Sequence, residues 1–113
     1  MLTAVIHRFA QDAIRLAPQN ESPWNYLRGL LRKANKPWAT VEGFAQEFAR
    51  LDDLDNIRSS HALDLLADVY AEENGREDEA ARALDLLAKN YDPIRANYWN
   101  YRKSLLEQRV AAA

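Results

Sequence analysis

The stretch AIRLAPQNESPWNYLRGL, from Ala13 to Leu30, contains the end of one helix, a turn and the start of a second helix. Pro18 cannot continue the first helix, because its ring removes a backbone N–H and clashes with the preceding turn. Ser22 is expected to cap the second helix, and Pro23 suits the first helical position, where a backbone N–H has no partner. The stretch therefore predicts a helical hairpin whose second helix buries Trp24.

Helical periodicity continues along the rest of the chain. Apolar residues recur at steps of three and four, and alternating runs of β-branched residues are missing. Thr40 is expected to cap the third helix, and Asn74-Gly75 to end the fourth in the left-handed conformation. Six helices are predicted, at about residues 3–16, 22–34, 41–51, 60–73, 77–89 and 93–108.

The same periodicity predicts which side chains face the core. The residues expected to point inward from the first, third and last helices are Ile6, Phe9, Ala10, Ala13 and Ala17; Val41, Phe44, Ala45, Phe48 and Leu51; and Ile94, Tyr98, Tyr101 and Leu105. Short links favour antiparallel neighbours, and a single hairpin cannot bury its own apolar face. We therefore expect one all-α domain over residues 1–113, an alpha-alpha superhelix of three stacked hairpins at about 3–34, 40–73 and 77–108, with right-handed curvature.

A repeat supports this arrangement. Pro18 precedes Trp24 by six residues, and Pro93 precedes Trp99 by six residues, so the two copies lie two units of 37 or 38 residues apart. In a degenerate middle copy, Asp55 and His61 stand at the proline and tryptophan positions. The residues expected to form the core of the repeat motif are Pro18, Trp24, Pro93, Tyr98 and Trp99.

Composition excludes several classes of protein. The chain has 113 residues, a net charge of −2 and no cysteine, so neither nucleic acid nor a disulfide framework nor a thiolate metal site is expected. No apolar run is long enough to cross a bilayer, and residues 1–6 lack the pattern of a secretory signal. We expect a cytoplasmic protein that does not insert into membranes.

The repeat resembles that of protein prenyltransferase alpha subunits, in particular the farnesyltransferase/geranylgeranyltransferase type I alpha subunit. The similarity is carried by Asn20-Glu21-Ser22 and Trp24-Asn25-Tyr26-Leu27, by Leu65–Tyr70, and by Ala81–Lys89 followed by Tyr98-Trp99. The chain departs from the family pattern in three places. Glu21 replaces a tyrosine, Leu27 replaces an arginine that Arg102 keeps in the last copy, and Arg95 stands where an asparagine is usual.

The resemblance implies a function. The family's holoenzyme transfers a farnesyl or geranylgeranyl group from its diphosphate to a cysteine near the C-terminus of a target protein. It implies a beta subunit as partner, zinc held by that beta subunit, and magnesium assisting the farnesyl reaction. The family's active-site lysine and histidine lie in upstream hairpins that no position here matches. The chain is therefore expected to be the C-terminal part of a longer alpha subunit, a scaffold and interface with no catalytic or metal-binding residue, inactive and zinc-free by itself.

Partner contacts are expected at the first hairpin turn. Asn20, Ser22, Asn25 and Tyr26 form its polar lip, which serves either as a hydrogen-bonded turn or as a contact with the beta subunit. Arg28 is added to these candidates. It begins a basic strip with Arg32 and Lys36, which either compensates the helix dipole or faces acidic groups of a partner.

Other polar residues offer weaker signals. His7 and His61 lack a second ligand at helical metal spacing, so a structural role is favoured for both. Asp53 and Asp55 suggest a calcium loop, but the glycine and glutamate that such a loop requires are missing. Nothing in the sequence assigns a role to Trp38.

A free-standing adaptor built from tetratricopeptide-like repeats is the alternative function. Trp24 and Leu27 also match the start of that repeat, but its period of about 34 residues is shorter than the 37 or 38 found here. The proline-to-tryptophan spacing favours the prenyltransferase resemblance.

Overall fold

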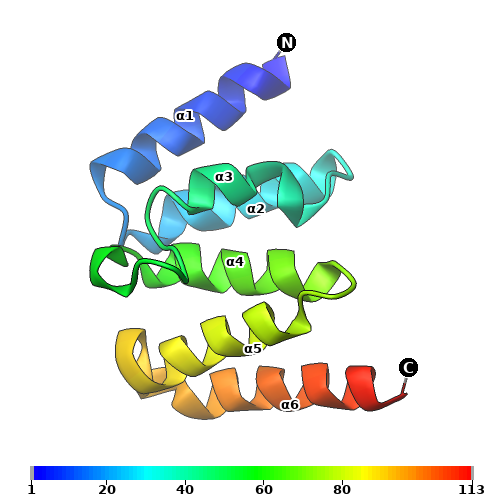
Figure 1. Ribbon diagram of the computed structural model, residues 1–113. Helices are drawn as coiled ribbons and strands as arrows, with labels where there is room; N and C mark the ends of the chain where they lie inside the picture. Colours follow the sequence, from blue (N-terminus) through cyan, green and yellow to red (C-terminus); the bar gives the residue numbers. More distant parts are fainter. Residues whose placement is uncertain (1, 113) are drawn as a thin grey trace.

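The computed structural model describes residues 2–112, and side chains from residue 7 onward. It is all-helical, as the sequence predicts, and no strand occurs among the described residues. The helices lie in a stack with α1 at one end and α6 at the other (Figure 1). The α-helices are α1 (Leu2–Leu16), α2 (Glu21–Lys33), α3 (Glu42–Ala45), α4 (Ser60–Glu72), α5 (Glu77–Leu86) and α6 (Ala96–Ala112).

The start of α2 differs from the prediction. Asn20, not Ser22, is the N-cap, and its Oδ1 accepts a hydrogen bond from the Ser22 backbone N–H at 3.3 Å. Pro23 then occupies the third helical position, which is tolerated because the N–H groups of the first turn have no intrahelical acceptor. The helix ends where Asn35 adopts a left-handed conformation with φ of 55°, and the N–H of Lys36 bonds to the carbonyl of Leu31 at 2.9 Å.

The predicted third helix is much too long. A 3-10 turn at Trp38–Val41 leads into α3, which has only four residues, and Thr40 does not cap it. The turn that follows α3 is held by Arg58: its backbone N–H bonds to the Phe48 carbonyl at 2.6 Å, and its guanidinium bonds to the Glu47 carbonyl at 2.7 Å. In a continuing α-helix these carbonyls would accept from residues four positions later.

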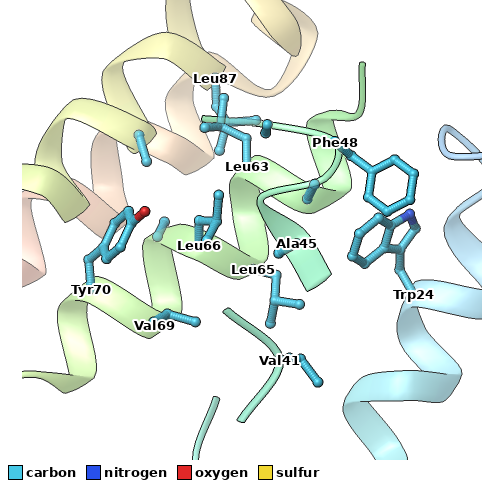
Figure 2. Packing of buried hydrophobic residues seen from close by; sticks show 14 of the residues in the cluster. Trp24, Val41, Ala45, Phe48, Leu63, Leu65, Leu66, Val69, Tyr70 and Leu87 are labelled. Atoms are coloured by element: carbon cyan, nitrogen blue, oxygen red, sulfur yellow. The ribbon is translucent and has the colours of Figure 1, made fainter. Parts of the chain in front are cut away.

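Helix α4 forms the centre of the core. Leu63, Leu65 and Leu66 are completely buried, and Figure 2 shows them between the α5 side and the aromatic pair Trp24 and Phe48. Phe48 packs edge-on against Trp24, with ring centroids 5.7 Å apart. The short α3 segment therefore fills the space between α2 and α4 with aromatic side chains rather than with a full helix.

The ends of the last two helices differ from the prediction. The Asn74-Gly75 turn ends α4 as expected, with Gly75 at φ of 91°. A π-helical turn at Leu87–Tyr91 prolongs α5, and a 3-10 turn at Pro93–Arg95 precedes α6, which runs to Ala112 instead of 108.

The inward faces of the end helices were predicted only in part, since Ala10 of α1 is buried as expected. Phe9 on α1 is 72% exposed, and α6 buries Trp99 and Leu106 instead of the predicted stripe. The stripe residues are all exposed: Ile94 by 96%, Tyr98 by 49%, Tyr101 by 59% and Leu105 by 45%. The reason is their position in the stack: α1 and α6 each have a neighbour on one side within the described chain (Figure 1). Tyr98 is thus not a core residue of its repeat, although its ring packs against that of Trp99 with centroids 4.9 Å apart.

Candidate functional site

The second helices of the three hairpins are joined by four charged side chains. Asp64 and Asp68 lie four residues apart on one face of α4, between Arg28 of α2 and Arg102 of α6. Arg102 bonds to both carboxylates, with Nη1 2.5 Å from Asp64 Oδ1 and Nη2 2.7 Å from Asp68 Oδ1. Arg28 Nη1 is 2.7 Å from Asp68 Oδ2. We call these four residues the arginine–aspartate cluster.

The arginine–aspartate cluster is largely shielded from water. The side chains of Arg28 and Arg102 are 12% and 17% exposed, and those of Asp64 and Asp68 are 28% and 30% exposed. Burial lowers the pKa of the Arg102 guanidinium, but the charges of Asp64 and Asp68 raise it by more, so the net shift is upward. Two carboxylates are therefore held between two cations in a partly dry setting, where charged hydrogen bonds are stronger than at the surface.

One guanidinium nitrogen in this cluster is incompletely bonded. Arg28 Nη2 is buried without a hydrogen-bond partner, and it lies 3.6 Å from Asp64 Oδ1. That distance is within ion-pair range but too long for a hydrogen bond. The guanidinium also stacks over the Trp38 ring at 5.0 Å, as Arg32 does at 5.3 Å. Trp38 thus has a role that the sequence did not reveal, as the aromatic surface beneath the basic strip of α2.

The two repeat tryptophans are equivalent in position. Trp24 and Trp99 are the fourth residues of α2 and α6, and each is only 2% exposed, in agreement with the expected burial. The fourth residue of α4 is Leu63, which is fully buried, whereas His61 lies nearer the surface with Nε2 3.2 Å from the Gln19 carbonyl. The middle copy therefore carries leucine, not histidine, at the tryptophan position.

The motif prolines serve the two copies differently. The Pro18 carbonyl accepts the indole N–H of Trp24 at 2.8 Å and the hydroxyl of Ser59 at 2.6 Å. In the last copy the indole N–H of Trp99 bonds to Asp92, the residue before Pro93, through the carbonyl at 3.2 Å and the carboxylate at 3.1 Å. Pro93 itself begins the 3-10 turn.

The predicted partner contacts separate into two groups. The first group is exposed and consists of Asn20, Ser22, Asn25 and Tyr26. Within it, Asn20 caps α2, and Asn25 donates a 3.3 Å hydrogen bond to Glu21. Arg28 lies apart from them because its guanidinium points to α4 and belongs to the arginine–aspartate cluster. For Arg28, acidic groups do face the basic strip, but they are supplied by the next hairpin of the same chain and not by a partner.

A second charged cluster, centred on Arg76, was not predicted from the sequence. Arg76 bonds to Glu42 and Glu79 at 3.1 Å and to Glu73 at 3.0 Å, and its guanidinium lies 4.2 Å from the centre of the Tyr70 ring. The hydrogen bonds that it donates to Glu79 and Glu42 raise the pKa of the guanidinium. Glu79 at three residues from Arg76 was a readable signal, but Glu42 comes from another hairpin.

Neither a metal site nor a membrane span is found among the described residues. Between residues 2 and 112, no three histidine, aspartate or glutamate side chains gather so that they could hold a metal ion. Within the same range no helix combines the length and the apolar character that a membrane span requires.

Comparisons with known proteins place the chain among prenyltransferase alpha subunits. The family model "Protein prenyltransferase alpha subunit repeat" matches residues 7–34. The protein farnesyltransferase/geranylgeranyltransferase type-1 subunit alpha of Candida albicans is 38% identical over 98 residues, covering 87% of this chain and 31% of that protein. The corresponding subunit of Dictyostelium discoideum is 30% identical over 104 residues, covering 90% of this chain and 32% of that protein.

A solved structure agrees with these relatives. The structure described as Candida albicans protein geranylgeranyltransferase-I complexed with GGPP contains a chain that matches with a TM-score of 0.86 and 35% identity. The match covers 92% of this chain and 34% of that chain. The chain thus spans about a third of the length of the curated relatives that it matches.

Proposed function

We propose that this chain, which is a homologue of the alpha subunit of protein farnesyltransferase/geranylgeranyltransferase type 1, serves as helical scaffold in a heterodimeric protein prenyltransferase. The complete enzyme would attach a farnesyl or geranylgeranyl group to a cysteine near the C-terminus of its target proteins. The observation that carries the proposal is the 38% identity to the Candida albicans alpha subunit over 87% of this chain.

Within such an enzyme, this chain would contribute rigidity and surface. The arginine–aspartate cluster joins α2, α4 and α6, and the Pro18 carbonyl joins the first turn to the cap of α4 through Ser59. These links between hairpins favour one fixed curvature over a range of curvatures. A fixed curvature is what a scaffold needs in order to hold a partner subunit in a constant orientation.

The proposed contact with a beta subunit is the lip of the first hairpin turn. Asn20, Ser22, Asn25 and Tyr26 support it because they are exposed and lie on successive turns at the start of α2. Tyr26 is half exposed, and tyrosine contributes strongly at protein interfaces because a rigid ring carries a polar hydroxyl. Arg28 would act indirectly, by fixing α2 against α4.

The chemistry of the reaction is assigned to other parts of the enzyme by the family resemblance. Zinc would be held by the beta subunit, magnesium would assist the farnesyl reaction, and the prenyl diphosphate and protein substrates would bind to the holoenzyme. The proposed location is the cytoplasm. The beta subunit is the proposed partner, and neither nucleic acid nor a membrane is proposed.

Co-expression tests the proposal. The chain would be produced together with a farnesyltransferase beta subunit and, separately, with a geranylgeranyltransferase type I beta subunit. We expect co-purification with at least one of them and, when the chain is isolated, no prenylation of a cysteine-containing peptide with zinc and a prenyl diphosphate present. Isolation free of both beta subunits would speak for the adaptor alternative, and turnover by the isolated chain would overturn the scaffold role.

Point variants locate the contact. Tyr26→Ala and Asn25→Ala are expected to reduce the yield of the complex while leaving the helical content of the chain unchanged. Lys89→Ala serves as control, because Lys89 is exposed on the turn after α5 and lies outside the proposed lip. An equal loss in all three variants would remove the lip from the interface.

A further inference from the structure

Helix α6 has a second apolar face that nothing in the described chain covers. Ile94, just before the helix, and Tyr98, Tyr101 and Leu105 are each at least 45% exposed. Their spacing of four, three and four residues matches the first and fourth positions of a heptad repeat, which lie on one seam; Ile94 belongs to the preceding 3-10 turn, and Gln108 occupies the next seam position after Leu105. The face lies at the end of the stack opposite α1 (Figure 1).

The two edges of this seam differ in charge. Along one edge stand Arg95, Arg102 and Arg109, each seven residues after the last. Along the other edge stand Asn97, Ser104 and Ala111, which are uncharged and share the same spacing. In a pair of heptad helices, the residues at these edge positions lie beside those of the partner and decide which helices pair and in which direction.

The three arginines are not equally available. Arg95 bonds to Asp92 at 2.7 Å, and Arg102 belongs to the arginine–aspartate cluster. Arg109 donates to the Ala71 carbonyl at 2.6 Å, and no carboxylate lies within 4.0 Å of it between residues 2 and 112. Arg109 also borders a groove of about 230 Å³ between α4 and α6. Leu105 of the seam lines the same groove.

We propose that this face of α6 binds an amphipathic helix of a partner protein, one with an apolar heptad seam and carboxylates along the edge that meets Arg109. The apolar positions supply the seam, and Arg109, which has no carboxylate within 4.0 Å in the described part of the chain, selects the charge of the partner's edge. The inference is independent of the prenyltransferase assignment, because it depends only on the spacing, exposure and charge of α6.

A second copy of the chain fits this surface less well. Antiparallel pairing of two α6 helices would bring the arginine edges of both copies together, and like charges at a pairing edge are unfavourable. Parallel pairing would place each arginine edge beside Asn97, Ser104 and Ala111, which offer no opposite charge. A helix with an acidic edge satisfies both features of the surface.

Two labelled peptides test the proposal. Both would be about 21 residues long, or three heptads, with the same leucine and isoleucine seam, and their edge positions would be glutamate in one and lysine in the other. Fluorescence anisotropy against the full chain would give the two affinities. We expect the acidic peptide to bind about threefold to tenfold more tightly, the range that one or two half-exposed ion pairs support.

Variants assign the effect to α6. Arg109→Glu is expected to abolish the preference for the acidic peptide, whereas Arg82→Glu, the same charge change at an exposed position of α5, should leave it intact. Leu105→Asp should weaken both peptides by about tenfold or more, and its far-ultraviolet circular dichroism should match that of the parent. Equal affinity for the two peptides, absence of binding, or binding that survives Leu105→Asp would overturn the proposal.

Sedimentation of the unliganded chain tests the competing occupant. We expect a monomer at the concentrations of the peptide assay. A dimer that Leu105→Asp dissociates would identify the occupant as a second copy and would likewise overturn the proposal.

Discussion

Trp24 and Trp99 hold the same place in their hairpins, yet different parts of the chain surround them. The indole of Trp24 packs against Phe44 and Phe48, and its acceptor, the Pro18 carbonyl, is shared with Ser59. Phe44, Phe48 and Ser59 all belong to the next hairpin. The indole of Trp99 bonds to Asp92 and contacts the Tyr98 ring and the guanidinium of Arg95, all within its own hairpin.

The comparison shows that one sequence motif can do two kinds of structural work. Around Trp24 it connects hairpins, because the following hairpin supplies the aromatic rings and the second donor. Around Trp99 it closes the end of the described stack, because the Asp92 carboxylate accepts hydrogen bonds from Trp99 and Arg95, which belong to the same hairpin. Trp24 and Trp99 are therefore equally buried, yet Trp24 contributes more to holding neighbouring hairpins together.

Removing the two rings is the strongest test of this difference. Trp24→Ala should lower the free energy of unfolding by about 4–5 kcal/mol, and Trp99→Ala by about 3 kcal/mol, the upper and lower parts of the range for large buried aromatic residues. The cavity at Trp24 opens between hairpins, where Phe44 and Phe48 lose a neighbour. Urea denaturation gives both values, and equal losses would show that the two sites are energetically alike.

Removing the arginine–aspartate cluster should have the next largest effect on the free energy of unfolding, since the cluster joins α2, α4 and α6. Asp68→Ala leaves Arg28 and Arg102 short of an acceptor in a partly buried place, so the free energy of unfolding should fall by about 1–3 kcal/mol. Asp85→Ala is the control, because Asp85 pairs with Lys103 between α5 and α6 and has a similar exposure of 32%. If Asp68→Ala lowered the free energy of unfolding by less than Asp85→Ala, the cluster would not be a principal link between the hairpins.

The sequence predicted the helices better than their faces. Pro18 and Gly75 mark real ends of helices, because their effect on the backbone is local. The short α3 could not be foreseen, since the turn after it is held by Arg58, which comes from beyond the following loop. The exposed stripe of α6 was misread because an apolar period does not tell whether a neighbouring helix is present.

The candidate site was predictable only in part. Burial of Trp24 and Trp99 follows from the apolar period of their helices. The pairing of Arg28 with Asp68 spans 40 residues, so the spacing within each helix shows that each side chain has a suitable face but not that the faces meet. Asp64 and Asp68 at four-residue spacing were a readable half of that cluster.

Ser59 offers a smaller and more local test of the inner connection. Its hydroxyl donates to the Pro18 carbonyl, and its oxygen accepts from the Ala62 N–H at 3.2 Å as the N-cap of α4. Ser59→Ala should therefore cost about 1–2 kcal/mol, the upper part of the range for loss of a cap. Ser60→Ala, one residue later, should cost less because the Ser60 hydroxyl bonds only to the Gln19 side chain at 3.2 Å. Thermal melts that reverse this order would argue against the shared carbonyl as a link.

The corresponding residue at the terminal site should have the smallest effect. Asp92→Asn keeps a side-chain oxygen that can accept the Trp99 indole N–H, and the backbone carbonyl of residue 92 accepts the same hydrogen in any case. What the variant removes is the ion pair with Arg95, whose side chain is 49% exposed, and exposed pairs contribute about 0–1 kcal/mol. The loss in a urea melt should thus stay below about 1 kcal/mol and shrink further at high salt, since mobile ions screen such a pair. A loss as large as that of Ser59→Ala would mean that Asp92 holds the terminal hairpin as firmly as Ser59 holds the inner one, and the distinction between the two tryptophan sites would fail at its closing contact.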